Sequence, residues 1–281
     1  MYETVARKIM PQPVVSAMMC GCMESGRDVV DGGAKYNSTG VSGIGLGNVV
    51  ESLNVIDKLC FKDKSVSTRE LYDALVANWE GYEDLCQTIL AEVPHYGNDD
   101  PYADVEMQWI CDLYYRLCGE LYSVRSKKFK SGLYGASDHV AQGKDTWATP
   151  DGRRAGDPMA DATSPAQGRD LNGPTAVFNS PCCFDHSRYM DGLALNMRIH
   201  PSSVNTDEGL GKLKEMTKAY FSNGGMEVQY NIVSAETMRA AQADPQTYRD
   251  LVVRIAGFSA YFVEMTPDLQ NDIISRTENA F

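Results

Sequence analysis

The chain has 281 residues, of which 43% are hydrophobic and 23% charged, and its formal net charge is −12 at pH 7. This composition is typical of a globular protein with one large domain or two smaller ones, and the acidic balance argues against a nucleic-acid-binding surface. No run of about 18 apolar residues predicts a membrane span, and the charged segment 1–13 does not look like a signal peptide, so we expect a cytoplasmic protein.

Eight cysteines and four histidines are present. None of them has the spacing of a zinc site or of a CxxC motif, so we expect no metal centre. Two arrangements leave a reactive thiol open, the adjacent pair Cys182 and Cys183, and Cys22 two residues before Glu24, but structural roles are favoured for both. The cysteines that fall in helical patterns are predicted to be buried as small apolar side chains; they are Cys60, Cys86, Cys111 and Cys118.

The first half of the chain reads as glycine-rich backbone followed by helices. The segment 13–47 does not match a phosphate-binding loop, and we expect irregular backbone packed closely against other segments. Apolar residues at helical spacing predict helices over 49–61, 67–91 and 102–121. Prolines and glycines then predict a long irregular segment over 131–180.

The second half mixes strands and helices. Apolar and polar residues alternate over 193–200 and 226–233, which predicts two strands. Helices are predicted over the segments 207–221, 235–243, 246–252 and 267–278. An α/β fold follows from this order of elements.

Gly257 lies in the apolar stretch Val252–Phe262. A glycine weakens the interior of a strand or helix, so its presence needs a reason. Spacing alone favours a bulge or a close approach of two backbones. The alternative is chemical, because a glycine α-carbon radical meets no side chain of its own and can lie flat and delocalised between two amides.

The segment Arg254–Phe262, with the sequence RIAGFSAYF, resembles the radical loop of the glycyl radical enzymes. This family includes pyruvate formate-lyase and the diol and choline lyases. One departure stands in the loop, where Phe258 replaces the usual tyrosine and so keeps the ring without the hydroxyl. Four further blocks resemble family blocks in the same order; they are 16–37, 150–176, 224–234 and 270–278.

The resemblance covers nearly the whole chain, but family members are usually much longer. It implies the C-terminal half of a ten-stranded barrel, which is built from two antiparallel half-barrels surrounded by helices. Residues 1–150 would be the C-terminal part of the catalytic lyase domain, and residues 151–281 the glycine radical domain around Gly257. Because a half-barrel exposes strand edges and apolar surface, we expect association or poor solubility.

The resemblance also implies a function, which is a lyase of the dehydratase or decarboxylase type that cleaves C–X or C–C bonds and stores its radical on Gly257. A separate activating enzyme, which uses S-adenosylmethionine and an iron–sulfur cluster, would remove a hydrogen atom from the Gly257 α-carbon. The radical would then pass to a cysteine and on to a small-molecule substrate. No cofactor need stay bound, and Arg254 and Gln229 are candidate groups for positioning the loop.

The cysteine of this relay is expected upstream of residue 16, so none of Cys22, Cys182 and Cys183 is assigned to it. The implied partners are the activating enzyme and an N-terminal half or further copies of the chain, with no nucleic acid and no membrane. Two alternatives stay open. In the first, the chain is a non-catalytic partner or remnant that supplies a radical loop to another polypeptide. In the second, it belongs to an enzyme with formate acetyltransferase-like activity.

Overall fold

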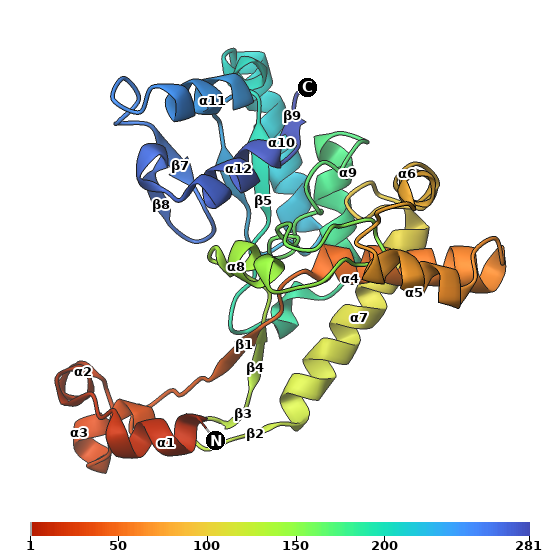
Figure 1. The fold of residues 1–281 in the computed structure, drawn as a ribbon. Helices are drawn as coiled ribbons and strands as arrows, with labels where there is room; N and C mark the ends of the chain where they lie inside the picture. The colour runs from red at the N-terminus through yellow and green to blue at the C-terminus, as the bar shows by residue number, and fades with distance from the viewer. Residues whose placement is uncertain (1) are drawn as a thin grey trace. The chain divides into compact units, whose positions relative to one another are not determined.

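The computed structural model describes residues 2–281 and divides into two compact units (Figure 1). Unit 1 comprises the chain up to Ser42 together with Asp112–Gly132 and Arg188–Gly192, and unit 2 comprises Gly43–Cys111, Leu133–Ser187 and Leu193–Phe281. No helix within residues 2–281 has the length and apolarity needed to cross a bilayer.

Unit 1 contains short helices and two small strand pairs. Strand β1 pairs in parallel with β4, and β2 pairs in antiparallel fashion with β3. Its elements are α1 (Tyr2–Ile9), α2 (Pro13–Met18), α3 (Cys22–Ser25), η1 (Val29–Asp31), β1 (Gly40–Ser42), β2 (Tyr122–Ser123), β3 (Lys127–Lys128) and β4 (Lys130–Gly132). The long helix α7 (Pro101–Glu120) confirms the helix predicted over 102–121. It begins in unit 2 and ends in unit 1.

The glycine-rich segment of unit 1 is packed closely, as predicted, but it is not irregular throughout, because it contains α2, α3, η1 and β1. A Cβ added at Gly33 would lie 2.0 Å from the backbone oxygen of Arg27, and one added at Gly21 would lie 2.5 Å from the backbone nitrogen of Lys35. Since no side chain fits in these places, glycine here is a packing requirement rather than a sign of ligand binding.

Unit 2 is an α/β arrangement with a three-stranded parallel sheet in the order β6–β5–β9 and an antiparallel hairpin β7–β8. The strands are β5 (Asn196–Ile199), β6 (Gln229–Asn231), β7 (Val252–Arg254), β8 (Ser259–Tyr261) and β9 (Glu278–Asn279). The helices are α4 (Leu46–Val55), the π-helix η2 (Ile56–Lys62), α5 (Thr68–Val76), α6 (Glu83–Glu92), α8 (Asp138–Lys144), α9 (Pro174–Asn179), η3 (Ser180–Cys183), η5 (Pro201–Val204), α10 (Asp207–Ser222), α11 (Ala235–Ala243), η6 (Phe262–Glu264) and α12 (Pro267–Ser275). A short 3₁₀ turn, η4 (His186–Arg188), lies where the chain passes from unit 2 to unit 1.

The single helix predicted over 67–91 is wrong, because the chain forms two helices, α5 and α6. Between them Asn78 and Trp79 adopt positive φ angles of 51° and 66°. The turn places the Trp79 ring fully inside the core, where its Nε1–H donates to the carbonyl of Arg153 at 3.2 Å. Burial of this large side chain outweighs the continuity of the helix.

Three further expectations near the site need correction. The segment 131–180 is not irregular throughout, since it contains α8 and α9. The helix predicted over 246–252 is absent, because the Asp244 carboxylate caps a turn by accepting hydrogen bonds from the N–H and the hydroxyl of Thr247, and Val252 already begins strand β7. The last helix stops at Ser275 rather than Glu278, because Glu278 pairs with Arg198 as part of β9 beside β5.

Candidate functional site

Gly257 lies in the turn of the β7–β8 hairpin. The strands pair from Val252 with Tyr261 to Arg254 with Ser259, and the N–H of Ile255 donates to the carbonyl of Phe258 at 2.9 Å. Gly257 is exposed with a φ of 82°, and a Cβ added to it would meet no atom within 4 Å. The bulge or close backbone approach that the spacing favoured is therefore wrong, because glycine is needed here for the turn conformation and not for space.

The hairpin rests on a small core of unit 2. Val253 and Phe262 are buried against Met238 of α11 and Ile273 of α12 (Figure 1). The tip beyond this core is open, and Phe258 is 45% exposed. The hairpin thus presents the Gly257 α-carbon at the surface of unit 2 while its base is fixed.

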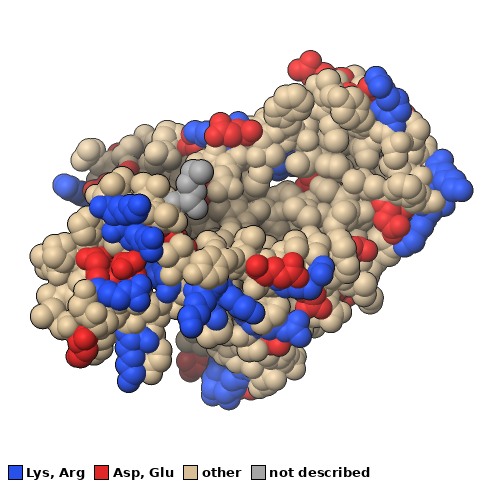
Figure 2. Space-filling model, turned by 90° about the horizontal axis from the view of Figure 1, so that it is seen from below, with Lys and Arg blue, Asp and Glu red and all other residues tan. Residues whose placement is uncertain are grey.

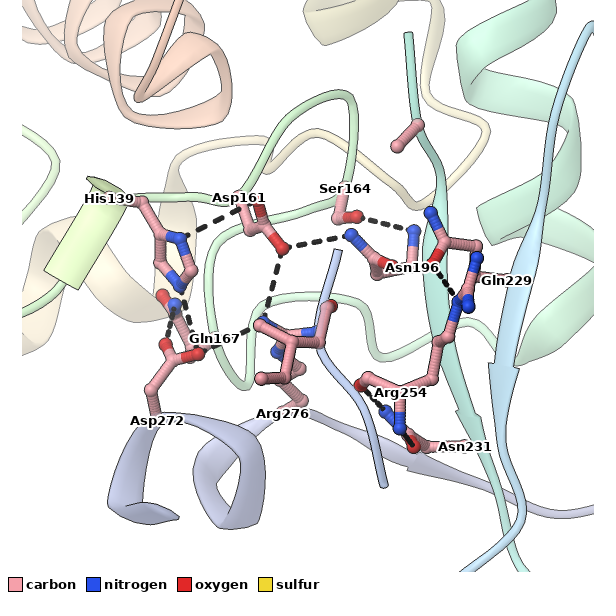
Figure 3. Close-up of polar contacts among 12 residues, drawn as sticks. His139, Asp161, Ser164, Gln167, Asn196, Gln229, Asn231, Arg254, Asp272 and Arg276 are labelled. Carbon is pink, nitrogen blue, oxygen red and sulfur yellow. Dashed lines mark hydrogen bonds and ion pairs between the residues drawn. The ribbon is translucent and has the colours of Figure 1, made fainter. Parts of the chain in front are cut away.

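Gln229 and Arg254, the two candidate positioning groups, contact each other in the structure (Figure 3). Oε1 of Gln229 accepts a hydrogen bond from Nε of Arg254 at 2.5 Å and a second from the N–H of Gly257 at 2.9 Å. One carboxamide oxygen on strand β6 therefore joins the arginine that precedes the turn to the glycine within it.

Asn231, which was not predicted from the sequence, completes this attachment. Its Nδ2 donates to the carbonyl of Arg254 at 2.5 Å, and its Oδ1 accepts from the N–H of Arg254 at 2.6 Å (Figure 3). A carboxamide offers one donor and one acceptor side by side, as a neighbouring strand would. The available signal was the alternation along β6, because residues two apart in a strand share a face and Gln229 was already a candidate.

A second polar cluster lies buried beside the hairpin and was also missed from the sequence (Figure 3). Oδ2 of Asp272 accepts from Nε2 of His139 at 2.9 Å and from Nη2 of Arg276 at 3.0 Å. The same Nη2 donates to Oδ2 of Asp161 at 3.1 Å. His139, Asp161 and Asp272 are at most 2% exposed, and buried charges of this kind persist only when they are paired.

The charges of the cluster stabilise each other. Burial alone would raise the pKa of Asp272, but Arg276 and His139 outweigh it and hold that pKa at about 2. Burial likewise works to lower the pKa of Arg276, and the carboxylates of Asp272 and Asp161 raise it instead. Nη1 of Arg276 reaches the carbonyl of Ile255 at 3.5 Å, so the cluster touches the hairpin two residues before Gly257.

A cavity of about 460 Å³ opens next to this cluster within unit 2. Asp272 and Gln167 line it together with Lys144, Arg153 and Arg169, so both signs of charge face the space. Gln167 also donates to Oδ1 of Asp272 at 2.7 Å, which leaves that carboxylate fully engaged. No group of three His, Cys, Asp or Glu side chains suited to a metal ion occurs in the described part of the chain.

Cys22 with Glu24 and the pair Cys182 and Cys183, the two arrangements considered for a reactive thiol, have the contacts of structural residues. Cys22 lies buried in α3 of unit 1, and the carboxylate of Glu24 accepts from the N–H of Gly21 at 2.9 Å as part of the helix start. Sγ of Cys182 donates to the carbonyl of Phe178 at 3.3 Å. Burial raises the pKa of Cys182 to about 11 and also raises that of Cys183, so both remain thiols at neutral pH.

The helical cysteines follow the prediction in three of four cases. Cys86, Cys111 and Cys118 are buried, whereas Cys60 is only half-buried.

Over the face shown in Figure 2, acidic and basic side chains are interspersed among wide uncharged areas.

Two family models match the chain in succession. The model described as pyruvate formate lyase-like matches residues 1–143, and the model described as glycine radical matches residues 159–263. The second match includes the β7–β8 hairpin and the strand that bears Gln229 and Asn231.

Known proteins resemble the chain over nearly its whole length. It is 37% identical to trans-4-hydroxy-L-proline dehydratase of Clostridioides difficile, with 99% of this chain and 35% of that protein covered. It is 39% identical to (2S)-3-sulfopropanediol dehydratase of Klebsiella oxytoca, with 99% and 34% covered. The solved B12-independent glycerol dehydratase from Clostridium butyricum, in its glycerol-bound form, matches with a TM-score of 0.94 at 36% identity, with 99% and 35% covered.

The chain therefore spans about a third of the length of the relatives it matches. A pyruvate formate lyase-like segment is followed by a glycine radical segment, and both the sequence and the fold closely resemble these enzymes. The chain therefore belongs to the glycyl radical enzyme family.

Proposed function

We propose that the chain is the C-terminal, radical-bearing part of a glycyl radical lyase and that Gly257 carries the radical. The observation that carries this proposal is the geometry of the hairpin tip. Gly257 is exposed, has no neighbour within 4 Å of a Cβ position, and has its N–H bonded to Gln229. Its α-carbon is thus accessible to another protein while the loop around it is held.

The chemistry at Gly257 is the loss of one hydrogen atom. The α-carbon–hydrogen bond breaks homolytically, and the atom passes to a carbon radical that an activating enzyme generates from S-adenosylmethionine at its iron–sulfur cluster. The glycyl radical later takes a hydrogen atom from a cysteine thiol, and the resulting thiyl radical attacks the substrate. Only glycine combines a hydrogen at the α-carbon with no side chain to oppose a flat radical.

The rest of the active site lies outside this chain. Because the chain spans about a third of its relatives, we assign the thiyl cysteine and most substrate contacts to an upstream segment or a second polypeptide. The strands of unit 2 would then form part of a ten-stranded barrel, with residues 1–150 as lyase-domain elements and 151–281 as the glycine radical domain. The exposed Val14, Met18 and Met23, each at least 72% accessible, support such a partner surface.

The substrate is proposed to be a small hydroxylated molecule that loses water. Both relatives and the solved structure described above are named as dehydratases. A decarboxylase role is the neighbouring possibility, since a 4-hydroxyphenylacetate decarboxylase glycyl radical subunit is 31% identical over 97% of this chain. An alternative is a chain that makes no product itself and supplies its radical loop to another polypeptide.

Oxygen cleavage tests the assignment of Gly257. The chain is incubated anaerobically with an activating enzyme, exposed to air, and its fragments are weighed by mass spectrometry. We expect a break at Gly257 that releases a C-terminal piece ending at Phe281. Intact chains after verified activation, or a break elsewhere, would remove Gly257 from the proposal. Turnover of a hydroxylated substrate only after an upstream polypeptide is added would separate the incomplete lyase from a complete one.

A further inference from the structure

The backbone conformation of Gly257 does not suit a delocalised radical. Such a radical is stabilised when its half-filled orbital overlaps the π systems of both flanking amides, which requires both amide planes to coincide with the trigonal plane of the α-carbon. At a φ of 82°, the amide before Gly257 is turned nearly perpendicular to that plane. Loss of the hydrogen atom therefore favours rotation about the N–Cα bond toward the extended region at positive φ, which is essentially restricted to glycine.

Gln229 opposes this rotation. The N–H of Gly257, which the rotation moves, is bonded to Oε1 of Gln229 at 2.9 Å. That oxygen is itself held by Nε of Arg254 at 2.5 Å. Because a guanidinium only donates, the oxygen end of the carboxamide must face Arg254, which fixes the orientation of the side chain.

The side chain of Gln229 is also enclosed by the protein, because it is only 7% exposed. With its oxygen held by Arg254 and its side chain buried, Gln229 has little freedom to follow the Gly257 amide. The hydrogen bond to Gly257 is therefore kept in the turn conformation and lost in the extended one.

We propose that Gln229 is a positioning residue that stabilises the closed-shell form of Gly257 and releases its N–H when the radical forms. This inference rests on the proposed function, since it takes Gly257 as the radical site. Its consequence concerns the relay to cysteine. When the thiol S–H bond breaks and the α-carbon–hydrogen bond forms, the hydrogen bond to Gln229 is regained, so Gln229 favours the thiyl side of that equilibrium.

The contact is tested first without a radical. Amide hydrogen exchange is measured on the whole unactivated chain and on the variant Gln229→Leu, which removes the acceptor. We expect exchange at Gly257 to accelerate between about two- and tenfold, the effect of one hydrogen bond, while exchange at Ile255 stays unchanged. The N–H of Ile255 is the control, because it bonds to Phe258 inside the same hairpin.

A second variant keeps the test decisive if Gln229→Leu loosens the hairpin. Gln229→Glu retains an acceptor for Gly257 and Arg254, and we expect it to keep the slow exchange at Gly257. Unchanged exchange in Gln229→Leu, or lost protection in Gln229→Glu with Ile255 still protected, would overturn the inference.

The radical state is tested after anaerobic activation. We expect the same α-hydrogen splitting in the electron spin resonance spectra of the wild-type chain and Gln229→Leu, because the contact is absent in the radical. Quenching by 2-mercaptoethanol, which returns a hydrogen atom to Gly257, should be several-fold slower in Gln229→Leu. A changed splitting or unchanged quenching would contradict the role of Gln229, whereas no radical in the wild-type chain would contradict the proposed function itself.

Discussion

The side chain of Asn231 forms two hydrogen bonds with the backbone of Arg254, one to its carbonyl at 2.5 Å and one from its N–H at 2.6 Å. Strand β6 lies at the edge of its sheet, and β7 belongs to a separate hairpin. A single carboxamide therefore makes the kind of attachment that a strand ladder usually makes. It fixes the hairpin three residues before Gly257.

Replacement of Asn231 by aspartate should weaken this attachment. The variant Asn231→Asp loses the donor and faces the Arg254 carbonyl with a carboxylate oxygen, and Asn231 is buried. We expect the free energy of unfolding to fall by about 1–3 kcal/mol, the cost of an unsatisfied buried group, in urea denaturation. Asn271→Asp is the control, because Asn271 is exposed and uses only its oxygen toward Gln242. Equal losses in both variants would contradict the role of Asn231.

Loss of Arg276 should be among the most damaging single changes in unit 2. Arg276→Met leaves the buried carboxylates of Asp161 and Asp272 without their shared cation. Removal of one partner from a buried ion pair costs about 3–5 kcal/mol. The matched variant Arg69→Met breaks an exposed pair with Asp73 and should cost less than about 1 kcal/mol. Similar melting temperatures for the two variants would show that the buried cluster contributes no more than a surface pair.

The depressed pKa of Asp272 should make the chain less stable at low pH. Burial raises its pKa, but Arg276 and His139 lower it further, to about 2 from the ordinary 3.8. A carboxyl group with a depressed pKa contributes stability above pH 3.8 that is lost as the pH falls toward 2. The shift corresponds to about 2 kcal/mol. Urea titrations at pH 5 and pH 2.5 should show this loss in the wild type and a smaller one in Asp272→Asn, and identical pH profiles would contradict it.

Asp104 on α7 should contribute to the pH dependence of stability with the opposite sign. Burial raises its pKa to about 6 from 3.8, more than the hydrogen bond from Ser180 lowers it. The folded chain then holds a proton that the unfolded chain releases, so this contribution is complete below pH 3.8 and lost as the pH rises through 6. Because the side chain is only partly buried, we expect Asp104→Asn to gain about 1–2 kcal/mol at pH 8 and little at pH 4. A gain that is equal at both pH values would contradict the assignment.

Local periodicity predicted the elements in which apolar residues recur at regular spacing. Helices α7 and α10 and strands β5 and β6 lie where apolar spacing placed them. The β7–β8 hairpin was not foreseen, because its turn at Ala256 and Gly257 lacks the Asn-Gly or Asp-Gly signal of a tight hairpin and its flanks are apolar on both faces. The segment 246–252 has helical spacing, but the Asp244 cap and the pairing of Val252 prevail over it.

The buried cluster could not be read from the sequence for a different reason. His139, Asp161 and Asp272 are far apart along the chain, and each is an unremarkable polar residue in its own segment. Only packing brings them together, and the cost of burying charge then dictates that they pair. Gln229 and Arg254 were candidates because they lie in blocks that resemble the family, and Asn231 was within reach of the same argument through its alternation with Gln229.

Electron spin resonance after anaerobic activation tests most directly whether Gly257 carries the radical. The variant Gly257→Ala adds a Cβ that meets nothing within 4 Å, and Gly81→Ala is a matched control with a φ of 79° and equally open space. Both should cost about 1–2 kcal/mol through the positive φ. We predict an organic radical in the wild-type chain and in Gly81→Ala and none in Gly257→Ala. The same radical signal in Gly257→Ala would contradict it.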